Sequence, residues 1–257
     1  MKKILFATLS LLITACLFAQ DETAQSVQLR DTTEKTTLEV NKPAKKPKKK
    51  YNLSNRASDH FMVQLGYTNW ANTPDSIPTR GFSRSVNVYF MFDFPFKSSP
   101  KLSAAIGLGV GSDHVFLDDV FADVKGRTST MRFLDTANVS IKKTKVVTTY
   151  LEVPLELRYT ANPENTDKSF KAAVGVKVGT MLRGGTRSRI TTPTSYPNYL
   201  LKEANKQYFN TTRIVGTARV GYGHLSLFGT YQLTSVLKTG AGPQLRPYTI
   251  GITFSGL

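Results

Sequence analysis

Residues 150–159, with the sequence YLEVPLELRY, alternate between apolar and polar side chains. The odd-numbered positions are all apolar, whereas the even-numbered ones carry the charges of Glu152, Glu156 and Arg158. Side chains of a strand point alternately to its two faces, so the pattern predicts a strand with one apolar and one charged face. No helical stripe fits it. Pro154 cannot donate a backbone hydrogen bond, so we expect a bulge or a local break in strand pairing there.

Residues 170–183, FKAAVGVKVGTMLR, show the same alternation, with Lys171, Lys177 and Arg183 on the polar side. This segment is far longer than an ordinary strand of about five or six residues. A tilted strand that crosses a bilayer needs roughly 9–11 residues, although a large soluble barrel also uses long strands. Beyond residue 20 the chain has no apolar run of about twenty residues, which excludes a transmembrane helix but not a transmembrane barrel.

Six further segments alternate in the same way, which makes eight predicted strands in all. The other six are residues 61–68, 85–94, 102–111, 213–222, 224–232 and 248–254. The connections alternate between long and short, with long ones at 69–84, 112–144, 184–211 and 234–246. This alternation is typical of an outer-membrane barrel, in which short turns face the periplasm. We therefore predict an all-β fold: an eight-stranded antiparallel transmembrane up-and-down β-barrel with both termini in the periplasm.

The direction of the apolar face separates a membrane barrel from a soluble, lipocalin-like binding barrel, whose interior is apolar. Three features favour an apolar exterior. The polar face is rich in glycine, which suits the narrow inside of an eight-stranded barrel. Aromatic residues of the apolar face lie near strand ends, like two interfacial girdles. The apolar face has no charged residue, and one Arg or Lys at the bilayer midplane would cost roughly 2–4 kcal/mol.

The N-terminal region divides into two parts ahead of the barrel, which we assign to residues 58–257. Residues 1–20 have a basic start and an apolar region and are predicted to be a signal peptide, cleaved next to Ala19 or Gln20. The sole cysteine, Cys16, is then removed, unless it is a lipidated N-terminus. Residues 21–57 are predicted to be a disordered periplasmic segment rich in Lys and Pro.

Six lysines cluster in the second part of this segment: Lys42, Lys45, Lys46, Lys48, Lys49 and Lys50. Such a run is either a solvated tail or an electrostatic tether, to anionic lipid head groups or to an acidic partner protein. We expect no nucleic-acid partner, because the chain is predicted to be exported and no aromatic residues interleave the lysines.

The polar faces of the strands carry charges that a closed barrel would bring together in its lumen. The predicted lumen charge network comprises Asp93, Glu152, Glu156, Arg158, Lys171, Lys177, Arg213 and Arg219, and the alternation adds Arg183 to the same face. Because an unpaired buried charge is expensive, we expect ion pairs that fill the lumen. The alternative is a small anion-preferring pore, since Arg and Lys give a cation excess of three on this face.

The predicted outer connections are also basic. Arg183, Arg187 and Arg189, with Lys142, Lys143 and Lys145 nearby, are expected to contact the phosphates of lipopolysaccharide. Ser112, Asp113 and His114 have the residue types of a lipid A-modifying enzyme, but Asp113 points away from the other two in a strand. Asp118, Asp119 and Asp123 match no EF-hand-type loop. We predict no enzymatic activity, cofactor or metal.

The chain resembles the Bacteroidetes-type outer-membrane β-barrel proteins known as PorT-like. The resemblance lies in Tyr150-Leu151-Glu152-Val153-Pro154-Leu155 with Arg158-Tyr159, in Val174-Gly175-Val176-Lys177-Val178-Gly179, and in residues 248–254. It implies an integral outer-membrane protein that is structural or an accessory of the type IX secretion apparatus. The long Lys- and Pro-rich tail and the C-terminal Phe254-Ser255-Gly256-Leu257 depart from that family's pattern. We expect a periplasmic or secretion-apparatus protein as the partner of the basic tail.

Overall fold

The computed structural model describes residues 60–79, 81–136, 141–190 and 198–256. The predicted signal peptide, Cys16 and the six clustered lysines lie outside these ranges. Among the described residues, no helix has the length and apolar character needed to cross a bilayer.

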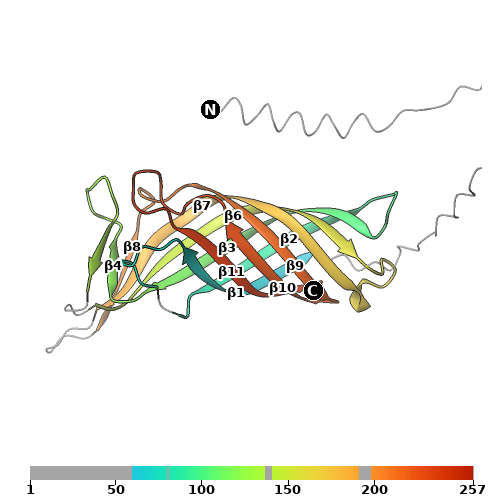
Figure 1. Cartoon of the computed structure of the whole chain (residues 1–257), viewed down its shortest axis with the longest axis horizontal. Helices are drawn as coiled ribbons and strands as arrows, with labels where there is room; N and C mark the ends of the chain where they lie inside the picture. The colour runs from blue at the N-terminus through green and yellow to red at the C-terminus, as the bar shows by residue number, and fades with distance from the viewer. Residues whose placement is uncertain (1–59, 80, 137–140, 191–197, 257) are drawn as a thin grey trace, which may run out of the picture. The chain divides into compact units, whose positions relative to one another are not determined.

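Eight antiparallel strands form a closed barrel with tilted strands (Figure 1). They are β1 (Phe61–Ala71), β2 (Arg84–Pro95), β3 (Leu102–Leu117), β6 (Ile141–Thr160), β7 (Phe170–Ile190), β9 (Thr212–Tyr222), β10 (Leu225–Gln232) and β11 (Arg246–Ser255). Each barrel strand pairs with the barrel strands that precede and follow it in the chain. The first and last strands, β1 and β11, pair with each other and close the sheet. The predicted fold class is confirmed.

The apolar residues of the strands point away from the barrel interior. The side chains of Val174 and Ile250 are 59% and 62% exposed, whereas Glu152 is fully buried and Arg219 is 7% exposed. This is the arrangement expected of a barrel whose outer surface meets hydrocarbon. A lipocalin-like arrangement, with an apolar interior along the strands, is excluded.

The connections lie at two distinct ends of the barrel. The turn end carries the chain's short connections 96–101, 161–169 (with the 3₁₀ helix η1, Thr166–Lys168) and 223–224, as well as the start of β1 and the end of β11. The opposite, loop end carries β4 (Val120–Asp123), β5 (Arg132–Asp135) and β8 (Tyr199–Ala204) (Figure 1).

The loop end is more regular than the sequence suggested. The segments 112–144 and 184–211, predicted as loops, contain the ends of β3 and β7, the start of β6 and the three additional strands. β4 and β5 form a hairpin, and β8 pairs with the end of β7. Barrel strands therefore continue past the apolar band, where polar residues no longer alternate with apolar ones and the pattern loses its signal.

A β-bulge in β7 changes the face on which later residues lie. Tyr150 pairs with Met181 while the preceding Thr149 pairs with Arg183, so Leu182 is an extra residue. Beyond the bulge, odd-numbered residues of β7 point outward. Arg183 is exposed, and its predicted position on the lumen face is wrong.

Pro154 lies in an uninterrupted pairing with β7, opposite Lys177. On the other side, the pairing of β6 with β3 skips Val153 and Pro154 and resumes in the same register. The expected local break in strand pairing is therefore confirmed on the β3 side, where proline offers no donor.

Candidate functional site

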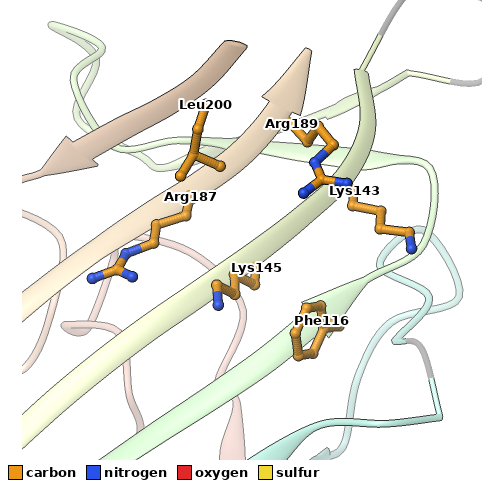
Figure 2. Close-up of a pocket in the computed structure, with 6 residues that line it drawn as sticks. All are labelled: Phe116, Lys143, Lys145, Arg187, Arg189 and Leu200. Atoms are coloured by element: carbon orange, nitrogen blue, oxygen red, sulfur yellow. The ribbon is translucent and has the colours of Figure 1, made fainter. Parts of the chain in front are cut away.

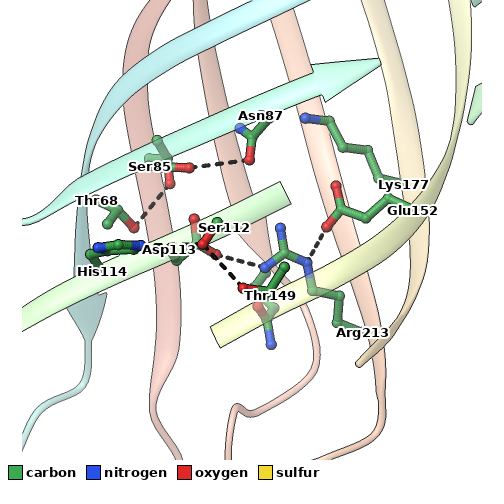
Figure 3. Close-up of polar contacts among 12 residues, drawn as sticks. Thr68, Ser85, Asn87, Ser112, Asp113, His114, Thr149, Glu152, Lys177 and Arg213 are labelled. Atoms are coloured by element: carbon green, nitrogen blue, oxygen red, sulfur yellow. Dashed lines mark hydrogen bonds and ion pairs between the residues drawn. The ribbon is translucent and has the colours of Figure 1, made fainter. Parts of the chain in front are cut away.

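The centre of the lumen is organised around Glu152 of β6. One carboxylate oxygen of Glu152 lies 2.5 Å from Nε of Arg213, and the other accepts a 2.5 Å hydrogen bond from the hydroxyl of Tyr89. Arg213 also contacts Asp113, with 2.6 Å between Nη1 and Oδ2 (Figure 3). Its guanidinium lies 4.4 Å from the ring centre of Tyr150. The carboxylate is thus compensated by a cation and a hydroxyl, as a buried charge requires.

Lys177 of the neighbouring strand β7 joins this cluster. Its ammonium donates to Oε1 of Gln64 at 2.8 Å and to the hydroxyl of Tyr89 at 3.1 Å. It also lies 4.6 Å from the centre of the Tyr89 ring, a cation–π distance. Gln64 in turn donates to the hydroxyl of Thr253 at 3.1 Å, so hydrogen bonds connect β7 across the lumen to β1 and β11.

A second charged layer lies nearer the turn end. Glu156 accepts from Nε of Arg158 at 3.0 Å and from Nη2 of Arg219 at 3.1 Å. Arg158 also lies 3.7 Å from Asp93, which accepts a 2.7 Å hydrogen bond from Ser103. Lys171 is likewise buried on the lumen side. The eight predicted lumen residues therefore all lie on the inner face of the barrel.

Four further residues belong to this interior and were not predicted from the sequence: Asp113, Tyr89, Gln64 and Tyr150. All four occupy polar-face positions of their strands, so the alternation could have placed them in the lumen. The predicted network included only charged residues within the predicted strands. With Asp113 included and Arg183 removed, the described lumen holds five cations, Arg158, Lys171, Lys177, Arg213 and Arg219. They face four anions, Asp93, Asp113, Glu152 and Glu156. The predicted cation excess of three is thus reduced to one.

An apolar cluster closes the loop end of the lumen. It joins strand residues such as Trp70, Tyr150 and Met181 to loop residues such as Phe209 and Leu245, all of them buried. The hydroxyl of Tyr208 donates to the carbonyls of Gly126 and Thr128, at 2.5 and 2.9 Å, and ties two long connections together. We call this cluster, with its loops, the cap. The lumen is therefore filled by charged layers and covered by an apolar one.

A basic surface lies on the outside of the barrel beyond the apolar band, and we call it the outer basic face. Its described members are Arg84, Lys143, Lys145, Arg183, Arg187, Arg189 and Lys202. Lys145, Arg187 and Lys202 are direct neighbours across β6, β7 and β8, and Lys143 pairs with Arg189 in the same way. Paired residues of neighbouring strands share a face, so these cations form two rows.

The outer basic face surrounds a hollow of about 290 Å³ lined by Phe116, Lys143, Lys145, Arg187, Arg189 and Leu200 (Figure 2). Phe116 of β3 forms one wall of this hollow. The ammonium of Lys145 lies 5.3 Å and the guanidinium of Arg84 lies 6.0 Å from the centre of the Phe116 ring. Arg183, Arg187 and Arg189, which were predicted to lie in an outer loop, lie on strand β7. Lys143 and Lys145 of β6 lie beside Arg189 and Arg187.

Ser112 and His114 share the outer face of β3, as alternation predicts. The Ser112 hydroxyl lies 3.3 Å from Nε2 of His114 and 3.1 Å from the Thr149 hydroxyl. Asp113 points into the lumen and is bound to Arg213, so it cannot orient His114. The three residue types do not assemble into a triad. Among the residues that the structure describes, no group of three or more His, Cys, Asp or Glu side chains is placed to hold a metal.

Comparison with known proteins agrees with this architecture. Residues 46–234 match a family model described as an outer membrane protein beta-barrel domain. No curated protein matches the chain. The match covers most of the chain, including seven of the eight barrel strands. The chain therefore belongs to the outer membrane protein β-barrel domain family and is an integral protein of the outer membrane.

Proposed function

We propose that this protein is a non-enzymatic, sealed barrel that acts as a structural or secretion-accessory component of the outer membrane, in the manner of PorT-like proteins. The observation that carries the proposal is the burial of the lumen. Glu152 and Gln64 are fully buried, and Lys177 is 2% exposed. These side chains occupy the middle of the lumen, which would have to contain water if the barrel were a pore. A sealed barrel offers its two ends and its outer surface to other molecules.

The alternatives find less support in the geometry. An anion-preferring pore needs cations that face water, yet the lumen arginines face carboxylates at 2.5–3.7 Å. A lipid A-modifying enzyme of the predicted kind needs an acid beside His114, and Asp113 is held on the other side of the sheet. Unchanged lipid A mass spectra after deletion of the gene would agree with a non-enzymatic role, and altered spectra would contradict it.

The partner side of the proposal rests on the Lys-rich segment of the sequence. Export would place residues 21–57 in the periplasm, where Lys42, Lys45, Lys46, Lys48, Lys49 and Lys50 would contact an acidic protein. The resemblance to PorT-like proteins makes a component of a secretion apparatus the candidate partner.

The test is affinity capture of the detergent-extracted full chain from cells. We expect replacement of all six lysines by glutamine to abolish capture of the partner, because the attraction is electrostatic. Replacement of the same six by arginine keeps the charge and should retain capture. If the glutamine variant recovers the same proteins as the wild type, the tether is wrong.

A further inference from the structure

The outer basic face begins where the outward apolar band ends. On β6 the outward positions change from Leu155 and Val153 to Lys145 and Lys143 along one continuous strand. On β3 they change from Leu108 to His114 and then Phe116. Because the apolar band matches the hydrocarbon core, the basic residues lie at the level of the lipid head groups on the loop side.

The bulge at Leu182 is what brings arginine to this face. With unbroken alternation, Arg183, Arg187 and Arg189 would all point toward the interior. The extra residue turns them outward, next to Lys143 and Lys145. Bulges re-aim side chains in this way and are common next to functional sites.

The cations of this face lie close to one another across neighbouring strands. Within the described parts of the chain, no ion pair or side-chain hydrogen bond joins Lys143, Lys145, Arg187 or Arg189 to a carboxylate. Like charges directly opposite each other across a sheet are destabilising, as for Lys145 beside Arg187. A bound anion would remove this repulsion.

We propose that the outer basic face binds the phosphate groups of a phosphorylated outer-leaflet lipid, namely the lipid A of lipopolysaccharide. The hollow between β3, β6, β7 and β8 accepts a phosphate, which Arg187 and Arg189 contact through their paired N–H groups and Lys143 and Lys145 through point charges. Phe116 and Leu200 supply apolar contact beside the phosphate. The acyl chains then follow the apolar strands below. This site is additional to the proposed secretion-accessory role and does not depend on it.

The test uses the full chain in detergent micelles, with bisphosphorylated lipid A as the probe and native mass spectrometry as the readout. The variant K143Q/K145Q/R187Q/R189Q should bind lipid A about tenfold or more weakly than the wild type, since it loses charge-assisted contacts. The control K97Q/K125Q/K168Q/K238Q removes the same charge from exposed lysines away from this face and should bind normally. Equal loss in both variants would mean that net charge alone attracts the lipid, and it would overturn the site.

Two further arms identify the ligand. Lipid A stripped of its phosphates should bind the wild type as weakly as intact lipid A binds the fourfold variant. Inorganic phosphate alone should not compete at equimolar concentration, because it lacks the apolar contacts. Undiminished binding of the stripped lipid, or equal binding of free phosphate, would overturn the assignment. If the fourfold variant does not fold, judged by its heat-dependent gel mobility, the pair K145Q/R187Q decides the question in the same assay.

Discussion

At the scale of single residues, the lumen depends on buried carboxylates and on the side chains that compensate their charge. Glu152 is fully buried and relies on Arg213 and Tyr89, while Asp113 relies on the same arginine. Removing one partner from a buried ion pair costs about 3–5 kcal/mol, because the remaining charge is left uncompensated. One arginine therefore compensates two carboxylates from different strands.

We predict that Arg213→Leu destabilises the barrel by about 3–5 kcal/mol, since two buried carboxylates would lose the cation that compensates them. The measurement is urea-induced unfolding of the barrel in lipid vesicles without lipopolysaccharide, followed by intrinsic fluorescence. Arg183→Leu is the matched control. It removes an arginine from the outer surface and should change the free energy of unfolding by about 0.5 kcal/mol or less.

The double variant Arg213→Leu with Glu152→Leu tests whether the lost stability comes from an uncompensated charge. Removing both charges of a buried pair is often close to neutral, so the double variant should recover part of the lost stability. A double variant that is less stable than Arg213→Leu alone would contradict the ion-pair explanation.

The same residues show what the sequence could and could not predict. Alternation placed eight charged residues inside the barrel, because the face of a strand residue depends only on its parity. It could not pair them, because partners such as Glu152 and Arg213 come from strands far apart in the chain. It failed for Arg183, because one extra residue reverses parity, and it overlooked Asp113, which lies past the predicted end of its strand.

At the scale of elements, the bulge at Leu182 separates two kinds of outer surface on β7. Before it, outward residues such as Val176 and Val178 face lipid, and after it the outward residues are basic. Met181 faces inward and Arg183 faces outward, and they pair with the adjacent residues Tyr150 and Thr149 of β6. Without Leu182, the residues on its two sides would therefore alternate regularly between the faces.

We predict that deleting Leu182 leaves a folded barrel, because the flanking residues keep both their partners and their faces. Deleting Val176 should prevent folding, because the residues between it and the bulge would exchange faces and bring Val178 into the charged lumen. Heat-dependent gel mobility after refolding into vesicles distinguishes folded from unfolded chains. If both deletions fold equally well, or both fail, the register of β7 is not set by its faces.

At the scale of the whole molecule, buried charged side chains occupy the lumen, the cap lies over its loop end, and the outer surface changes from apolar to basic along the strands. The strand number, the long and short connections and the outward apolar face were all predictable, because each is repeated in several segments of the chain. The cap was not, because its apolar contacts join loops whose sequences carry no periodic pattern. The described parts of these connections thus contribute buried apolar side chains that pack against residues of the barrel strands.

Closure leads to a prediction about transport. In planar bilayers the wild-type barrel should give no discrete conductance steps, because an ion would have to displace Lys177, Glu152 and Arg213 from their partners and then pass the cap. An eight-stranded barrel has an interior just wide enough for its own side chains, whereas barrels of about sixteen strands leave an aqueous channel. A sixteen-stranded porin under the same conditions therefore serves as the positive control. Steps of uniform size from the wild type, with an anion preference that changes in Lys177→Gln, would show that the lumen conducts and would replace the sealed barrel with the pore.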